Sequence, residues 1–166
     1  MLDYLPYKPS LNADVLTIFN ANRPYLALSK TIFDEESLLA DLQQRPASIL
    51  PENKHLEVIY CQQQAVAILD YLTGYKTADS VYLGLLLVKE HGQGFGKQIV
   101  RALINRSIVA GYKEIELAVL TENRAALVFW QLLGFTIFDT VAYEKDLKVH
   151  KMQLRLSSLT SEEHFL

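Results

Sequence analysis

Three alternating glycines, Gly92, Gly94 and Gly96, follow the longest apolar run of the chain. Such glycines let a loop turn several backbone N–H groups toward one point, and a helix that begins there adds a partial positive charge. Lys97 follows directly and adds a full charge. Residues 91–97, here called the glycine loop, therefore predict an anion site suited to phosphate.

Two common nucleotide-binding loops do not fit this spacing. A Walker loop ending on Gly96 and Lys97 needs a glycine where His91 stands, and Ser or Thr where Gln98 stands. A dinucleotide fingerprint needs its third glycine at position 97 or at position 99, where Ile99 stands. The residues at these positions therefore exclude both kinds of nucleotide-binding loop.

The neighbouring elements must hold this loop in place. Residues 81–88 form an unbroken apolar run, which is typical of a central strand covered on both faces. After the glycines the apolar period becomes that of a helix, and Gly111 suits its end. A strand over 114–120 and an amphipathic helix over 121–133 follow. The loop is thus predicted to join a buried strand to a helix.

The rest of the chain predicts two helices and four further strands. The helices are expected at 13–20, with Ser10 or Asn12 as the cap, and at 35–44, capped by Asp34. Strands are expected over 56–61 and 65–72, and two more within 135–156, joined by a loop near 144–147. We therefore predict a single α/β (α+β) domain, residues 1–166, with a mixed sheet and helices on both faces.

Composition bounds the class of protein. The 166 residues carry 16 Lys and Arg against 19 Asp and Glu, a net charge of −3, which argues against a nucleic-acid partner. No apolar run approaches the roughly 18 residues of a membrane helix, and no signal peptide is recognisable. The lone Cys61 excludes an internal disulfide. We expect a cytoplasmic protein without membrane contact. We also expect no metal, because no Cys, Asp or Glu stands at ligand spacing from His55, His150 or His164.

Two blocks of the sequence resemble one enzyme family. His91-Gly-Gln-Gly-Phe-Gly96 resembles the acyl-CoA pyrophosphate loop, [Arg/Gln]-x-x-Gly-x-[Gly/Ala], of the Gcn5-related N-acetyltransferase (GNAT) superfamily. The second motif of that superfamily is a strand, an Asn, an Ala three residues on, an aromatic pair and Leu-Gly-Phe. Its counterparts here are 117–122, Asn123, Ala126, Phe129-Trp130 and Leu133-Gly134-Phe135. The order of elements agrees as well, so the resemblance covers nearly the whole chain.

The resemblance implies the GNAT fold, a mostly antiparallel sheet whose central strands, 81–88 and 114–120, splay apart. The pantetheine arm of acetyl-CoA would lie in that gap, against backbone groups of Leu86, Leu87 and Val88, and one N–H would polarise the thioester carbonyl. Asn123 would meet the arm or the loop, or would instead cap the last helix. The pyrophosphate would be held by the loop residues His91, Gly92, Gln93, Gly94, Phe95, Gly96 and Lys97, with the Phe95 side chain as a hydrophobic anchor.

Two departures from the family pattern concern catalysis. Trp130 stands where many members have a Tyr that protonates the leaving thiolate, and an indole N–H cannot serve as that acid. Tyr143 is a substitute acid or an ordinary strand tyrosine. The apolar strand 81–88 carries no acidic residue, so the remaining candidates for the general base are Asp70 and Glu116. Either carboxylate is alternatively a solvated charge on a strand.

The resemblance therefore implies an acetyl-CoA-dependent N-acetyltransferase. An amine acceptor, a small molecule or a peptide, would attack the thioester directly in a ternary complex. The alternative is a non-catalytic acyl-CoA-binding or interaction module of the same fold. The sequence leaves the oligomeric state open, and a homodimer is compatible with it.

The first position of the glycine loop makes a prediction of its own. His91 lacks the permanent charge of the usual Arg, so we expect phosphate binding to be weaker or more dependent on pH, and not to be lost. Calorimetric titration with CoA between about pH 5.5 and 8.5 measures this dependence. The variant His91→Gln is expected to lose it, and a flat profile in the original protein would contradict the prediction.

Overall fold

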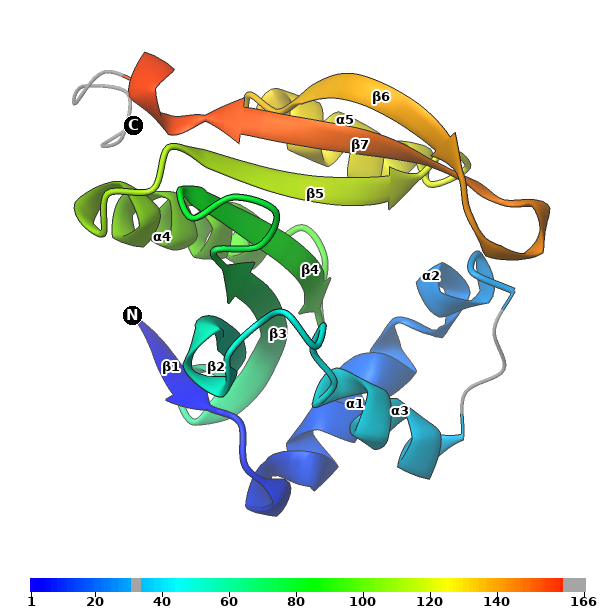
Figure 1. Ribbon diagram of the computed structural model, residues 1–166. Coiled ribbons are helices and arrows are strands. Elements are labelled where there is room, and N and C mark those ends of the chain that lie inside the picture. The colour runs from blue at the N-terminus through cyan, green and yellow to red at the C-terminus, as the bar shows by residue number, and fades with distance from the viewer. Residues whose placement is uncertain (31–33, 160–166) are drawn as a thin grey trace.

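A single seven-stranded sheet organises the chain. The computed structural model describes residues 1–30 and 34–159. Along the sheet the strands follow the order β1-β2-β3-β4-β5-β7-β6, and every neighbouring pair is antiparallel except β4 and β5, which are parallel (Figure 1). The strand bounds are β1 Leu2–Pro6, β2 Lys54–Cys61, β3 Gln64–Thr73, β4 Ser80–Val88, β5 Glu114–Leu120, β6 Thr136–Ala142 and β7 Lys148–Arg155.

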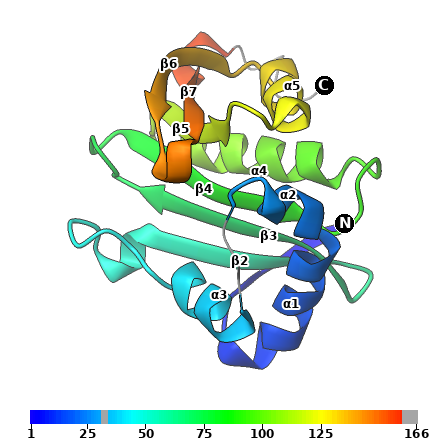
Figure 2. The ribbon, with the colours of Figure 1, turned by 90° about the vertical axis from the view of Figure 1, so that its right-hand side faces the viewer.

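Helices cover both faces of this sheet, as the sequence predicts. One face carries α1 (Asn12–Ala21), α2 (Arg23–Ala27) and α3 (Glu35–Leu42), and the other carries α4 (Phe95–Val109) and α5 (Arg124–Leu132) (Figures 1 and 2). No helix in the described ranges is long and apolar enough to cross a membrane.

Each face has its own hydrophobic core. The α1–α3 side buries Val15, Ile18, Phe19, Leu38, Leu42, Val58, Ala65, Ile68 and Leu87. The α4–α5 side has a larger core, which includes Ile59, Leu69, Val81, Leu83, Ile99, Leu103, Ile115, Leu117, Trp130, Phe135 and Met152. Strand β4 supplies side chains to both cores, which is why its sequence shows no polar alternation.

The predicted elements are confirmed, with shifts at their ends. Asp34 caps α3 as expected, since its Oδ1 accepts a hydrogen bond from the Ser37 N–H at 2.9 Å. The expected cap of α1 is wrong. A 3₁₀ turn, Pro9–Leu11, leads into α1, Leu11 is the capping residue, and the Asn12 side chain instead accepts a hydrogen bond from the Tyr7 hydroxyl. Helix α5 begins at Arg124, three residues later than predicted, because Asn123 caps it.

Sequence reasoning missed β1. This strand pairs along the outer edge of β2, from Leu2 opposite Cys61 to Pro6 opposite Glu57. Leu2 and Tyr4 pack against the core of the α4–α5 side, and the Tyr4 ring lies 5.0 Å from the Arg106 guanidinium of α4. The alternation of apolar and polar residues over 2–4 was the available signal, but so short an edge strand is defined by its partners.

One buried side chain joins the helical segment to the end of β4. Asn22 is only 3% exposed, and its Nδ2 donates to the Ile18 carbonyl at 2.8 Å and to the Val88 carbonyl at 3.0 Å. Val88 is the last residue of β4, immediately before the segment that leads into the glycine loop. Asn22 therefore fixes the position of the strand end on which that loop depends.

We expect Asn22→Ala to lower the free energy of unfolding by about 1–3 kcal/mol, because it leaves the Val88 carbonyl without its partner. Urea denaturation measures this change. Asn20→Ala is the matched control, since Asn20 is exposed and its side chain accepts hydrogen bonds from the Arg23 guanidinium on the surface of the helix. We expect the control to stay within about 0.5 kcal/mol. Equal losses in the two variants would contradict the role of Asn22.

Candidate functional site

Strands β4 and β5 pair at one end only. Their register runs from Ser80 opposite Glu114 to Tyr82 opposite Glu116, three pairs in all, although β4 continues to Val88 and β5 to Leu120. Figure 1 shows the two strands diverging beyond this point. The facing edges of residues 83–88 and 117–120 thus do not pair with each other, and such edges can accept an extended ligand as an added strand.

A bulge in β4 lies where the divergence begins. On β3, Tyr71 stands opposite Leu83 and Asp70 opposite Leu85, so Gly84 is the extra residue. Gly84 is exposed although it lies in the middle of a central strand. A bulge re-aims the local backbone, and this one borders the unpaired stretch between β4 and β5, residues 83–88 and 117–120, which we call the opening.

The opening leads to the glycine loop. Gly92 and Gly94 have φ angles of +83° and +79°, in the left-handed region that glycine adopts without strain. Gly94 is the N-cap of α4, and no side chain caps that helix end. His91, Gln93 and Lys97 are exposed beside the two glycines. The loop therefore presents uncapped backbone amides and one lysine to solvent, as phosphate binding requires.

Two other loop positions serve packing. A Cβ at Gly96 would lie 3.2 Å from the Phe129 Cζ, so this glycine lets α4 approach α5 closely. The Phe95 side chain packs against the core of the α4–α5 side, in agreement with its expected role as an anchor. These contacts hold the start of α4 against the sheet.

Asn123 is a helix cap in this structure. Its Oδ1 accepts a hydrogen bond from the Ala126 N–H at 3.1 Å, and the residue is 8% exposed. Of the two sequence interpretations of Asn123, capping is the one with an observed hydrogen bond. A role toward a ligand stays a prediction.

Trp130 belongs to the core. It is 7% exposed, and its ring makes edge-to-face contacts with Phe129 at 4.9 Å and Phe135 at 5.2 Å between centroids. Its bulk fills the space between α5 and the sheet.

The two candidate bases lie on the face that carries α1–α3. Asp70 pairs with Leu85, whose side chain packs against the core on that face. Leu72 is two residues after Asp70 on β3, so its side chain lies on the same face. Leu72 pairs with Tyr82 on β4, and Tyr82 pairs with Glu116 on β5, so Tyr82 and Glu116 lie on that face as well.

Each of these carboxylates forms an ion pair with a lysine. The Lys54 Nζ lies 2.6 Å from both Asp70 oxygens, in a largely buried pair. Burial raises the pKa of Asp70 above its usual value, and the hydrogen bond and charge of Lys54 oppose that rise. Glu116 accepts a hydrogen bond from the Lys76 Nζ at 2.8 Å.

Tyr143 interacts electrostatically with two other tyrosines, Tyr25 and Tyr82. It follows β6 and is half exposed, and its N–H donates to the Leu147 carbonyl at 2.7 Å. Burial raises the pKa of Tyr25 in α2, and the electrostatic effect of the Tyr143 phenol adds a smaller rise. Burial raises the pKa of Tyr82, with a smaller contribution from Tyr143. The Lys145 Nζ donates a hydrogen bond of 3.0 Å to the Lys30 carbonyl. This bond joins the turn between β6 and β7 to the segment after α2 (Figure 1).

Sequence reasoning missed three residues of this face: Tyr75, Lys76 and Tyr82. The available signal was weak, a single hydroxyl within the apolar run 81–88 and a Tyr-Lys pair in a turn. Among the described residues no group of three His, Cys, Asp or Glu side chains could hold a metal ion, and His164 lies outside those residues.

The glycine loop allows a matched test. Gly94→Asp places a side chain at a left-handed backbone position and adds negative charge at the uncapped start of α4. We therefore expect this variant to lose CoA binding, as measured by calorimetry. Gly111→Asp is the control, because Gly111 has a φ of +87° just after the opposite end of the same helix. We expect it to keep CoA affinity, with circular dichroism unchanged in both variants. Retained affinity in Gly94→Asp would refute the placement of the anion site.

Known structures share this architecture. An acetyltransferase from Thermus thermophilus superposes with a TM-score of 0.75 and 23% identity, covering 93% of this chain and 97% of that chain. A spermidine N-acetyltransferase from Vibrio cholerae, solved with CoA and spermine, gives 0.74 and 14%, covering 99% and 98%. A Salmonella typhimurium chain solved with its cofactor acetyl-CoA gives 0.64 and 16%, covering 96% of each.

The family comparison is more specific. Among curated proteins no sequence matches this chain. The family model described as the acetyltransferase (GNAT) family matches residues 19–135. That region includes the diverging strands β4 and β5, the glycine loop, and α5 with its capping Asn123. The chain therefore belongs to the GNAT family of acetyltransferase enzymes.

Proposed function

We propose that this protein transfers the acetyl group of acetyl-CoA to a primary amine by direct attack in a ternary complex. The observation that carries the proposal is the opening between β4 and β5, which leads to the uncapped glycine loop at the start of α4. The Vibrio and Salmonella relatives, solved with CoA and acetyl-CoA, support the choice of co-substrate. The spermine in the Vibrio structure supports an amine as the acceptor.

The residues present fit acetyl-CoA. The facing edge of β4 around Leu86, Leu87 and Val88 would pair with the amide groups of the pantetheine arm, as an added strand does. The backbone amides of the glycine loop would hold the pyrophosphate, assisted by Lys97 and His91. A backbone N–H aimed at the thioester oxygen would contribute about 3–4 kcal/mol to the attack.

The attacking amine must be neutral. An alkyl amine with an ordinary pKa near 10.4 is neutral in only about one part in 10³ at pH 7, so a proton acceptor assists the reaction. The C–N bond forms as the C–S bond breaks, and the proton of the amine passes to a carboxylate, directly or through water. We place Asp70 in this role ahead of Glu116, because Asp70 adjoins the bulge: a Cβ at Gly84 would lie 3.7 Å from the Asp70 Oδ2.

The thiolate of CoA leaves from the same opening. Trp130 supplies no proton to it, since an indole N–H is not an acid at working pH. Tyr143 is our candidate for this proton, because its phenol interacts electrostatically with those of Tyr25 and Tyr82.

A second candidate function rests on Trp130 and the two ion pairs. A module that binds acyl-CoA without turnover would keep the opening and the glycine loop, and would tolerate the loss of the acid and the pairing of both carboxylates. Calorimetric titration with acetyl-CoA, followed by an assay for released thiol with an amine panel, separates the two functions. Binding without thiol release would favour the module, and no binding would refute both.

We expect acetyl-CoA to bind and spermidine or another amine of the panel to release thiol. Asp70→Asn is then expected to lower kcat by about 100-fold, with the KM for acetyl-CoA unchanged, because it removes the proton acceptor and leaves the cofactor contacts in place. Asp79→Asn is the control, since Asp79 pairs with Lys113 on the surface. Equal kcat values in both variants would remove Asp70 from the mechanism.

A further inference from the structure

A lysine of the chain itself lies in an aromatic and acidic cluster near the opening. The Lys76 Nζ lies 5.6 Å from the centroid of the Tyr82 ring and 5.9 Å from that of Tyr75, besides its 2.8 Å contact with Glu116. The two rings meet edge to face at 5.2 Å. Aromatic faces within about 6 Å and a carboxylate are the groups that bind an alkylammonium ion. We call Tyr75, Tyr82 and Glu116 the ammonium cage.

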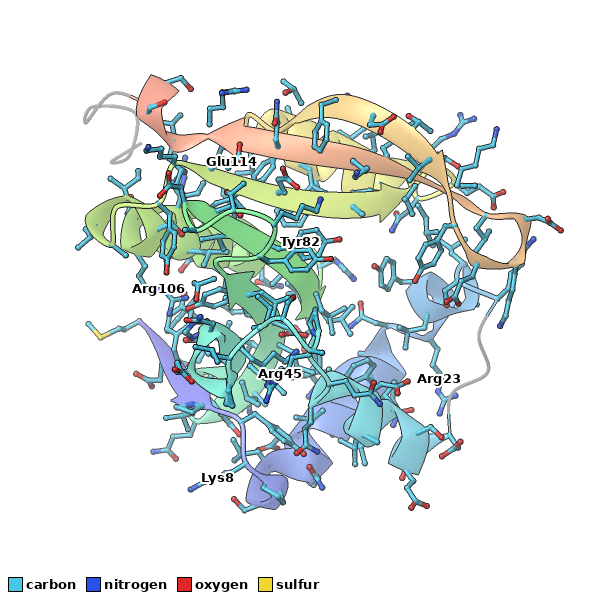
Figure 3. The ribbon with its side chains drawn as sticks, viewed as in Figure 1. Lys8, Arg23, Arg45, Tyr82, Arg106 and Glu114 are labelled. Atoms are coloured by element: carbon cyan, nitrogen blue, oxygen red, sulfur yellow. The ribbon has the colours of Figure 1, made fainter. Side chains whose placement is uncertain are left out.

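Two members of the cage belong to the rigid sheet. Tyr82 and Glu116 form the last cross-strand pair before β4 and β5 diverge, so they stand at the closed end of the opening. The Glu116 side chain is only 14% exposed. Figure 3 shows Tyr82 on β4 close to β5. The cage is therefore built where the far end of an arm anchored at the glycine loop would lie.

The occupant is held less firmly than the cage. Lys76 lies in the turn between β3 and β4, and its side chain is 38% exposed. Its φ of +70° falls in the left-handed region, which residues with a side chain adopt rarely. Ion pairs with this much exposure contribute little net stability, so a competing cation can displace Lys76.

We propose that the ammonium cage binds a cationic nitrogen of the acceptor, and that Lys76 occupies the cage until the acceptor displaces it. This inference rests on the proposed function. The carboxylate and the aromatic faces stabilise the charged form of a bound nitrogen, so that nitrogen is not the one that attacks. The acceptor class is therefore an amine with a second cationic centre, such as a diamine or polyamine. Glu116 is then a binding residue, and the proton acceptor lies elsewhere.

The cage can be tested without turnover. The probe is n-butylammonium chloride, titrated at constant ionic strength against protein carrying ¹³C-labelled tyrosine rings, with Tyr75→Phe and Tyr82→Phe to assign the resonances. We expect Lys76→Met to bind the probe about fivefold more tightly than the original protein, because the internal competitor is gone. Lys113→Met is the matched control, because it frees Asp79, an exposed carboxylate at the end of the same turn. We expect it to bind like the original protein.

Two further variants test the cage itself, each in the Lys76→Met background. Glu116→Gln removes the carboxylate, and Tyr82→Leu removes an aromatic face, so each is expected to abolish the gain. Glu114→Gln, on the same strand, is expected to retain it, and circular dichroism verifies that each variant folds. Equal affinity in Lys76→Met and Lys113→Met, or a gain that survives Glu116→Gln, would overturn the inference.

Calorimetry with acetyl-CoA on the same samples separates this inference from the proposed function. If acetyl-CoA binds and the tyrosine resonances do not respond to the probe, the cage is refuted and the acetyltransferase proposal stands. If acetyl-CoA does not bind, the proposed function fails, and the titration still reports on the cage. With turnover established, 1,4-diaminobutane is expected to have a lower KM than n-butylamine, and Glu116→Gln to remove that preference. Equal KM values for the two amines in the original protein would overturn the assignment of the acceptor class.

Discussion

The backbone pairing between β4 and β5 stops after three residue pairs, and the rest of the site depends on this interruption. In a closed sheet each strand would satisfy the N–H and C=O groups of its neighbour, and an unpaired buried backbone group costs about as much as a lost hydrogen bond. The exposure of Gly84 in the middle of β4 indicates that water reaches the strand here. An extended ligand can take the place of that water.

Several separate contacts hold the interruption open. The bulge at Gly84 changes the direction of β4. Asn22 fixes the far end of the strand through the Val88 carbonyl. The two cores pack on opposite faces, so neither strand can rotate toward the other without losing buried apolar contacts. The glycine loop and α4 then follow from β4 in a fixed place, because Phe95 and Gly96 pack against the core and against Phe129.

Much of this arrangement could be predicted from the sequence, because it follows from the order and spacing of residues that are close together in the chain. The apolar run 81–88 predicted a central strand, the glycine spacing predicted the loop that leads into α4, and the 117–135 block predicted β5 and α5. Edge strand β1 could not be found in this way, since five residues with a terminal proline are placed by β2 and by Arg106. Helix caps were predicted well only where the local signal was strong, as at Asp34.

The surroundings of Asp70 and Glu116, on the face that carries α1–α3, were the least predictable part. Asp70 and Glu116 are ordinary acidic residues in the sequence, and only the fold gives each a lysine partner. The ammonium cage joins a turn residue to a cross-strand pair, so it depends on register and on a left-handed turn, neither of which is encoded by spacing along the chain.

We propose that acetyl-CoA binds as an added strand between β4 and β5, and a crystal structure of the complex is the decisive measurement. We expect the pantetheine arm to lie between residues 83–88 and 117–120, with the pyrophosphate on the amides of the glycine loop. Acetyl-CoA bound outside this opening, or β4 and β5 paired along their full length in the complex, would refute this binding mode.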